Sequence, residues 1–91
     1  MKIKEIKVKS TTMPKQLAGS IMHSLNEDQQ VILTGIGAGA TNAMVKGCAV
    51  AISVYEAQDR ILATRPFFSN DIVNDKQITV MKMEIKEVIS W

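Results

Sequence analysis

The sequence predicts an α/β chain folded as an α+β two-layer sandwich, with element order β-α-β-α-β-β, a mixed sheet and two helices on one face. Two observations predict it: segments with helical apolar spacing cover residues 13–26 and 40–57, and apolar or alternating segments precede, separate and follow them. The chain has 91 residues, the size of one small domain. We therefore treat residues 1–91 as a single domain.

The first predicted strand covers residues 2–9. Ile6 and Val8 point to one face and Lys7 and Lys9 to the other, which is the pattern of a half-buried strand with a basic outer face. Alternatively, these lysines only form a solvent-exposed strand face, where they also protect a sheet edge against pairing with another chain.

The first predicted helix covers residues 13–26. Pro14 suits the first turn of a helix, and the hydroxyls of residues 10–12 are candidate caps. Leu17, Ile21 and Leu25 recur at every fourth position and form the stripe that we expect to be buried.

The second strand, residues 30–36, is almost wholly apolar, which is typical of a central strand. A glycine turn follows, and the second helix is expected at residues 40–57. Its apolar residues cover most of its circumference, so we expect it to be buried nearly all round.

The chain ends in a predicted hairpin. A third strand covers residues 60–68, where Pro66 marks an edge or an end of the strand. Residues 72–75 form the hairpin arm and its turn, and residues 77–89 form the last strand. In that strand Met81, Met83 and Ile85 alternate with charged residues, which predicts one dry and one wet face.

Composition argues against an enzyme. The chain has a single cysteine, Cys48, in an apolar helix, and a single histidine, His23, on the polar side of the other helix. A nucleophile needs a neighbouring base, and a metal site needs clustered ligands. We therefore expect no catalysis, no metal and no cofactor. A lone cysteine fits a reducing compartment, and the apolar runs are too short to span a bilayer, so we expect a cytoplasmic protein without a membrane segment.

Residues 33–47, LTGIGAGATNAMVKG, contain a possible phosphate-binding turn. Gly35, Gly37 and Ala40 fit the glycine pattern of dinucleotide-binding proteins, and Asp59 lies at about the spacing of the ribose-binding acid. The topology argues against that function. The turn follows the second strand rather than the first, and the chain closes with a hairpin instead of further parallel units.

A simpler anion site remains. The start of the second helix presents free N–H groups and a partial positive charge, with Gly37 and Gly39 allowing close approach. Thr41 and Asn42 lie beside it, and Lys46 follows one turn after Asn42. Alternatively, the glycines only allow the helix to pack against the sheet, with Asn42 as a local cap. The sequence does not choose between the two.

The charge is uneven although the net charge is only +2. Five lysines fall in the first fifteen residues, opposed only by Glu5, so one part of the chain is basic. Hydrophobic residues make up 46% of this short chain, more than we expect one small domain to bury. We therefore expect a homodimer or a higher homo-oligomer.

Several segments resemble the stage V sporulation protein S family of bacteria. They are IKVKS and MPKQLAGSI near the N-terminus, IGAGATNAMVKG at the glycine turn, and RPFFSNDI followed by ITVMKMEI. The resemblance covers nearly the whole chain and implies an Alba-like fold, named after a small archaeal chromatin protein, with the same element order. It also implies a dimer that binds nucleic acid.

Alba-like proteins contact nucleic acid through the loop after the first strand, the loop after the second strand and the final hairpin. Carried over, these are residues 10–15, residues 36–42, and residues 65–76. The chain departs from archaeal Alba proteins in having no arginine in the second loop. Backbone amides are then the expected phosphate donors there.

We therefore predict a regulatory protein that binds DNA or RNA with little sequence preference. Two alternatives stay open: an oligomeric protein-interaction module and a sensor of a small anionic ligand. The candidate phosphate-binding residues are Lys7, Lys9, Lys15, Gly37, Gly39, Thr41, Asn42, Lys46 and Arg65.

Overall fold

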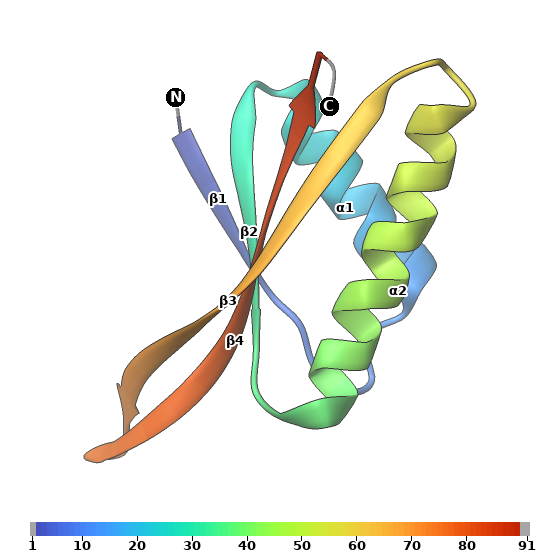
Figure 1. The fold of residues 1–91 in the computed structure, drawn as a ribbon. Coiled ribbons are helices and arrows are strands. Elements are labelled where there is room, and N and C mark those ends of the chain that lie inside the picture. The colour runs from blue at the N-terminus through green and yellow to red at the C-terminus, as the bar shows by residue number, and fades with distance from the viewer. Residues whose placement is uncertain (1, 90–91) are drawn as a thin grey trace.

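The computed structural model describes residues 2–89 and contains one four-stranded sheet and two helices (Figure 1). The sheet order is β1-β2-β4-β3, with β1 and β2 parallel and the other pairs antiparallel. The predicted element order and mixed sheet are confirmed. The elements are β1 (Lys2–Lys7), α1 (Pro14–Asn26), β2 (Gln29–Gly35), α2 (Gly37–Glu56), β3 (Ile61–Val73) and β4 (Lys76–Val88).

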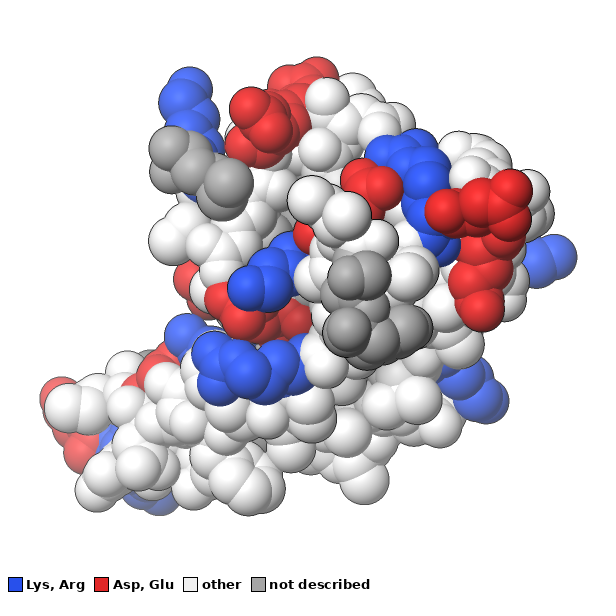
Figure 2. Space-filling view, turned by 45° about the horizontal axis from the view of Figure 1, so that its top comes forward, with Lys and Arg blue, Asp and Glu red and all other residues white. Residues whose placement is uncertain are grey.

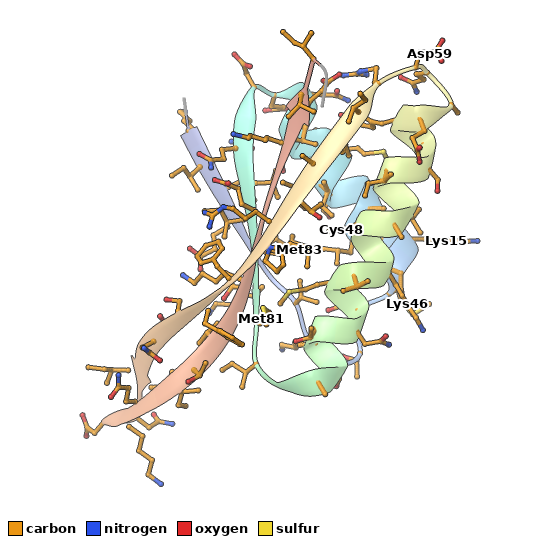
Figure 3. All side chains as sticks on the ribbon, in the orientation of Figure 1. Lys15, Lys46, Cys48, Asp59, Met81 and Met83 are labelled. Atoms are coloured by element: carbon orange, nitrogen blue, oxygen red, sulfur yellow. The ribbon has the colours of Figure 1, made fainter. Side chains whose placement is uncertain are left out.

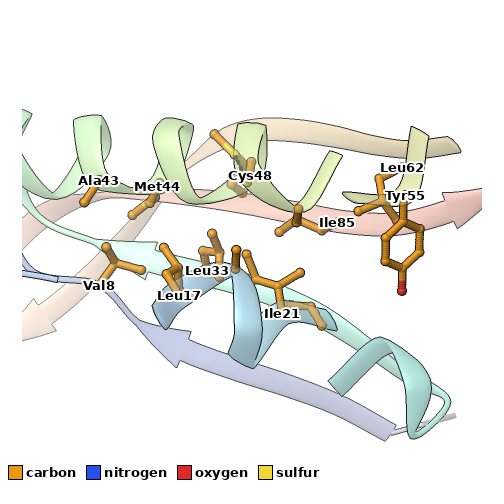
Figure 4. Packing of buried hydrophobic residues seen from close by; sticks show 14 residues of the cluster. Val8, Leu17, Ile21, Leu33, Ala43, Met44, Cys48, Tyr55, Leu62 and Ile85 are labelled. Atoms are coloured by element: carbon orange, nitrogen blue, oxygen red, sulfur yellow. Dashed lines mark hydrogen bonds between the residues drawn. The ribbon is translucent and has the colours of Figure 1, made fainter. Parts of the chain in front are cut away.

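Both helices cover the same face of the sheet, and the core lies between the two layers (Figures 1 and 4). The stripe predicted for α1 supplies Leu17 and Ile21, which are 2% and 0% exposed. From the sheet, Leu33 of the internal strand β2 and Ile85 of β4 face them. The dry and wet faces predicted for β4 are confirmed, since Met83 and Ile85 are buried and Lys86 is exposed.

Only one side of α2 is buried, so the prediction of nearly complete burial is wrong for the single chain. Met44 and Cys48 face the sheet and α1, whereas Val45 and Val54 are 52% and 38% exposed. The sheet and α1 together cover only part of a helix's circumference, and in one chain water meets the rest. Among the described residues, the structure has no helix long and apolar enough to cross a membrane.

The hairpin of β3 and β4 is longer than predicted. Strand β3 does not end near Phe68 but continues to Val73, and it passes through Pro66 because it is an edge strand with no partner on that side. Strand β2 pairs with β4 only from Met81 to Ile85, so the turn end of the hairpin forms an arm, residues 68–80 with Phe68 at its base, that projects about 17 Å past the shared sheet. Figure 1 shows this arm at the lower left.

The arm and both crossover loops lie at the same end of the molecule (Figure 1). The loop from β1 to α1 and the short connection from β2 to α2 meet below the helices, and the arm leaves the sheet beside them. The three segments expected to contact nucleic acid therefore share one end of the fold.

Candidate nucleic-acid interface

The β1–α1 loop is a compact turn held by its own polar groups. The backbone N–H of Lys9 donates to Thr12 Oγ1 at 2.8 Å, and the N–H of Thr12 donates to the Lys9 carbonyl at 3.0 Å. Buried Val8 anchors the loop, and its N–H donates to the Thr34 carbonyl of β2. Lys9 is exposed on this turn. The expectation that residues 10–12 cap α1 is wrong, since Met13 is the N-cap and no side chain caps it.

Helix α2 begins at Gly37, three residues earlier than predicted, so the expected glycine turn is largely the first turn of the helix. Gly37 has φ +89°, in the left-handed region that favours glycine, and it allows the chain to leave β2 and enter the helix at once. No side chain caps this N-terminus, and its first turn has no acidic residue. Its N–H groups and the positive end of the helix dipole are available to an anion.

Two glycines of the motif serve close packing. A Cβ on Gly35 would lie 2.9 Å from both the Val8 carbonyl oxygen and the Ala40 Cβ. A Cβ on Gly39 would lie 2.6 Å from the Ser10 Cβ, so the start of α2 touches the β1–α1 loop. Packing therefore accounts for Gly35 and Gly39. The contact at Gly39 also joins two of the three predicted binding segments.

The polar residues after the glycines have different positions. Thr41 Oγ1 donates to the Gly37 carbonyl at 3.0 Å, which leaves the hydroxyl oxygen as an acceptor and not a donor to phosphate. Asn42 is exposed in the second turn and is not the N-cap, so the alternative in which Asn42 caps the helix is wrong. Lys46 is exposed one turn further along. Asn42 and Lys46 remain available to a ligand, and Thr41 is engaged by the helix itself.

Lys15 and Lys46 come together although 30 residues separate them in the sequence. They line one shallow groove where the start of α1 crosses α2, together with Met13, Pro14, Ala49 and Val50. Figure 3 shows both lysines on the outer side of the helical layer, away from the sheet. The start of α2 contacts the β1–α1 loop at Ser10, and that loop leads to Met13 and Lys15 in the groove, so we treat these segments as one candidate site.

Arg65 and Lys7 lie elsewhere, on the sheet face opposite the helices. The Arg65 guanidinium lies over the Phe67 ring at 4.5 Å, and its Nε is 3.3 Å from Glu84 Oε1. Lys7 pairs in register with Thr34 at the end of β1, and Thr34 in turn pairs with Lys82. The structure does not bring Arg65 and Lys7 together with Lys15 and Lys46.

The open sheet face carries two cations that the site prediction missed, Lys82 and Lys86. The alternation along β4 already predicted that both face solvent. Only the strand order shows that Lys82 lies across the sheet from Lys7, with Thr34 of β2 between them. Acidic residues are interspersed: Lys82 Nζ lies 3.9 Å from Glu5 Oε1, and Gln30 donates to Glu84. Figure 2 likewise shows lysine and arginine broken up by acidic residues in the view that it gives. This face is less suited to a polyanion than the loop end.

Other candidate chemistry has structural explanations. Asp59 lies beyond the far end of α2, about 30 Å from the glycines, so it cannot contact the ribose of a dinucleotide bound there (Figure 3).

Burial raises the pKa of the Cys48 thiol to about 11, and its sulfur contacts Met83 Sδ at 3.3 Å. His23 is exposed beside Glu27. Within residues 2–89, acidic, histidine and cysteine side chains form no group of three able to hold a metal.

Comparison with known proteins gives a family match over most of the chain. No curated protein matches the chain. The family model described as Stage V sporulation protein S matches residues 4–88, which covers both helices, strands β2, β3 and β4, and β1 from Lys4 onward. The chain therefore belongs to the stage V sporulation protein S family, a family of sporulation-related proteins.

Proposed function

We propose that this protein is a regulatory factor that binds the phosphate backbone of DNA or RNA with little sequence preference. One observation carries the proposal: the β1–α1 loop abuts the uncapped N-terminus of α2, and Lys15 and Lys46 share a groove about 13 Å further along α2. The first-turn N–H groups suit one phosphate, and the lysines suit its neighbours along a strand.

The residues at this site recognise charge rather than base identity. Backbone N–H groups and lysine ammonium groups bind phosphate oxygens, whereas sequence is read by side chains that reach base edges. The segment from Ile36 to Asn42 carries no arginine and only short side chains besides Ile36. Little sequence preference and modest affinity follow.

We infer that the protein acts as a homodimer or higher homo-oligomer. Large apolar side chains of α2 and the arm meet water in the single chain, among them Val45, Phe68 and Ile72. A second copy would bury them and would add a second phosphate site to the same assembly. The single, buried cysteine fits a reducing compartment, so we place this function in the cytoplasm.

The test is the binding of labelled DNA and RNA, single- and double-stranded, at several salt concentrations. With about three phosphate contacts, the logarithm of the binding constant should fall with the logarithm of salt with a slope of about −3 for duplex DNA. Lys15→Ala combined with Lys46→Glu should weaken binding to every sequence alike.

A matched control is Lys2→Ala combined with Lys4→Glu. It makes the same change of charge on exposed residues at the far end of β1. If both double variants lose affinity equally, net charge and not this site drives binding. Absence of binding at low salt, or affinity that salt does not change, would rule the function out.

Exposed apolar residues support a second candidate function, an oligomeric protein-interaction module without nucleic-acid binding. Phe68 and Ile72 are 71% and 77% exposed on the arm. In that case the arm variant Phe68→Ser would abolish partner binding, and the lysine variants would have no effect. A sensor of a small anion would instead bind inorganic phosphate at the start of α2 and would show no further gain in affinity from a polymer.

A further inference from the structure

The tip of the hairpin arm combines exposed apolar side chains with acidic ones. Ile72 and Val73 are 77% and 39% exposed, and Asp71 and Asp75 flank them. The Asp71 carboxylate accepts a hydrogen bond from Ser69 Oγ at 2.9 Å, and neither aspartate forms an ion pair with a described side chain. Lys76 follows Asp75 and is also exposed, so the tip carries two acidic groups against one basic group. Its exposed apolar side chains and net negative charge suit an apolar groove with basic edges.

The groove between α1 and α2 has the complementary character. Its apolar lining comes from both helices, with Met13 60% exposed, and its two charged residues are Lys15 and Lys46. The described residues that line it include no acidic side chain. Neither lysine is ion-paired within residues 2–89.

The tip cannot reach the groove of its own chain. Figure 3 shows Lys15 and Lys46 on the outer side of the helical layer, whereas the arm leaves the sheet on the other side and points away. The arm is long enough to cross a gap between two molecules, because it projects about 17 Å past the shared sheet.

We propose that the arm tip of one copy docks in the α1–α2 groove of a second copy. Ile72 enters the apolar floor, and Asp75, in the turn beside it, pairs with Lys15 and Lys46. The proposal specifies the contact for the homo-oligomer of the proposed function, and it does not depend on nucleic-acid binding. Partially buried ion pairs at the edge set the register of the contact, and the apolar tip supplies most of its free energy.

Disulfide trapping without nucleic acid tests the contact directly. In a Cys48→Ala background, a chain with Ile72→Cys is mixed with a chain with Ala49→Cys, and the heterodisulfide is quantified after oxidation. The control partner carries Ser20→Cys, an exposed position on α1 outside the groove. We expect at least a fivefold higher yield with Ala49→Cys. Equal yields would overturn the proposal.

A charge exchange tests the ion pairs. Lys46→Glu in the groove chain should lower the trapped yield at least threefold, and Asp75→Lys in the tip chain should restore it. Circular dichroism checks that each variant is folded. Failure of Asp75→Lys to restore the yield would overturn the assigned pairing.

Sedimentation of the unmodified protein separates this inference from the proposed function. If the protein sediments as a homodimer but gives no heterodisulfide, the predicted oligomer is supported and the arm contact is overturned. A monomer whose groove binds an acidic, apolar peptide also overturns it, in favour of a foreign partner. Nucleic-acid binding by the same samples tests the proposed function independently of the arm contact.

Discussion

Gly35 lies where β2, α2 and the β1–α1 loop meet, and a methyl group there has no free space. An added Cβ would lie 2.6 Å from Met44 Cε and 2.9 Å from the Val8 carbonyl oxygen. The methionine end can move, but the backbone carbonyl cannot move without disturbing β1. Gly35→Ala should therefore lower the free energy of unfolding by about 1–3 kcal/mol, measured by urea denaturation.

Gly19 provides the matched control, since it lies exposed in the middle of α1 with nothing within 4 Å of an added Cβ. Gly19→Ala should raise the free energy of unfolding by about 0.5–1 kcal/mol, because alanine restricts the unfolded chain and favours the helix. If the two substitutions had equal effects, crowding at Gly35 would not be the cause.

Cys48 makes stability depend on pH in the alkaline range. Burial raises the pKa of its thiol from the ordinary 9.0 to about 11. The buried neutral thiol stabilises the fold fully below about pH 9, and this contribution is lost as pH rises towards 11.

The stability difference between the wild type and Cys48→Ala should therefore be constant near neutral pH. It should shrink by about 2 kcal/mol by pH 10.5. Urea denaturation of both proteins at pH 7, 9 and 10.5 measures it, and the variant corrects for lysine and tyrosine titration. A difference that does not change with pH would mean that the thiol ionises as easily in the fold as outside it.

At the scale of elements, the hairpin turn combines two left-handed residues. Asn74 and Asp75 have φ of 53° and 62°, as in the two-residue type I′ turn whose twist matches that of the flanking strands. Asn74→Ala should lower the melting temperature, because alanine tolerates this conformation less well than asparagine. Asp75→Gly should raise it. If Asn74→Ala were neutral, the turn would contribute nothing to stability.

Periodicity predicted the elements well where the pattern is local. The stripe of α1 and the alternation of β4 follow from side-chain direction alone. The errors lie where tertiary contacts decide. Helix α2 starts at Gly37 rather than near Ala40, because the left-handed Gly37 turns the chain directly out of β2. The length of the arm was missed because Pro66 looks like a strand end until β3 is known to be an edge.

At the scale of the whole molecule, the candidate site could be predicted only in part. Lys15 and Lys46 were identified separately, and their common groove depends on how α1 crosses α2. Arg65 was grouped with them because it begins the hairpin, yet the strand order turns it towards Glu84 on the other face. No spacing within one element contains that information, because it comes from the pairing of elements distant in sequence.

The same two lysines enter both proposals, so phosphate and the arm tip compete for one surface. An oligonucleotide should lower the yield of the heterodisulfide between Ile72→Cys and Ala49→Cys chains in proportion to its occupancy. Raising the salt concentration should weaken this competition, because salt lowers the affinity of the lysines for the phosphates of the oligonucleotide. The measurement is the trapped yield across a titration of single-stranded DNA, with an uncharged polymer as control. A yield that DNA leaves unchanged would place nucleic acid and the arm on separate surfaces.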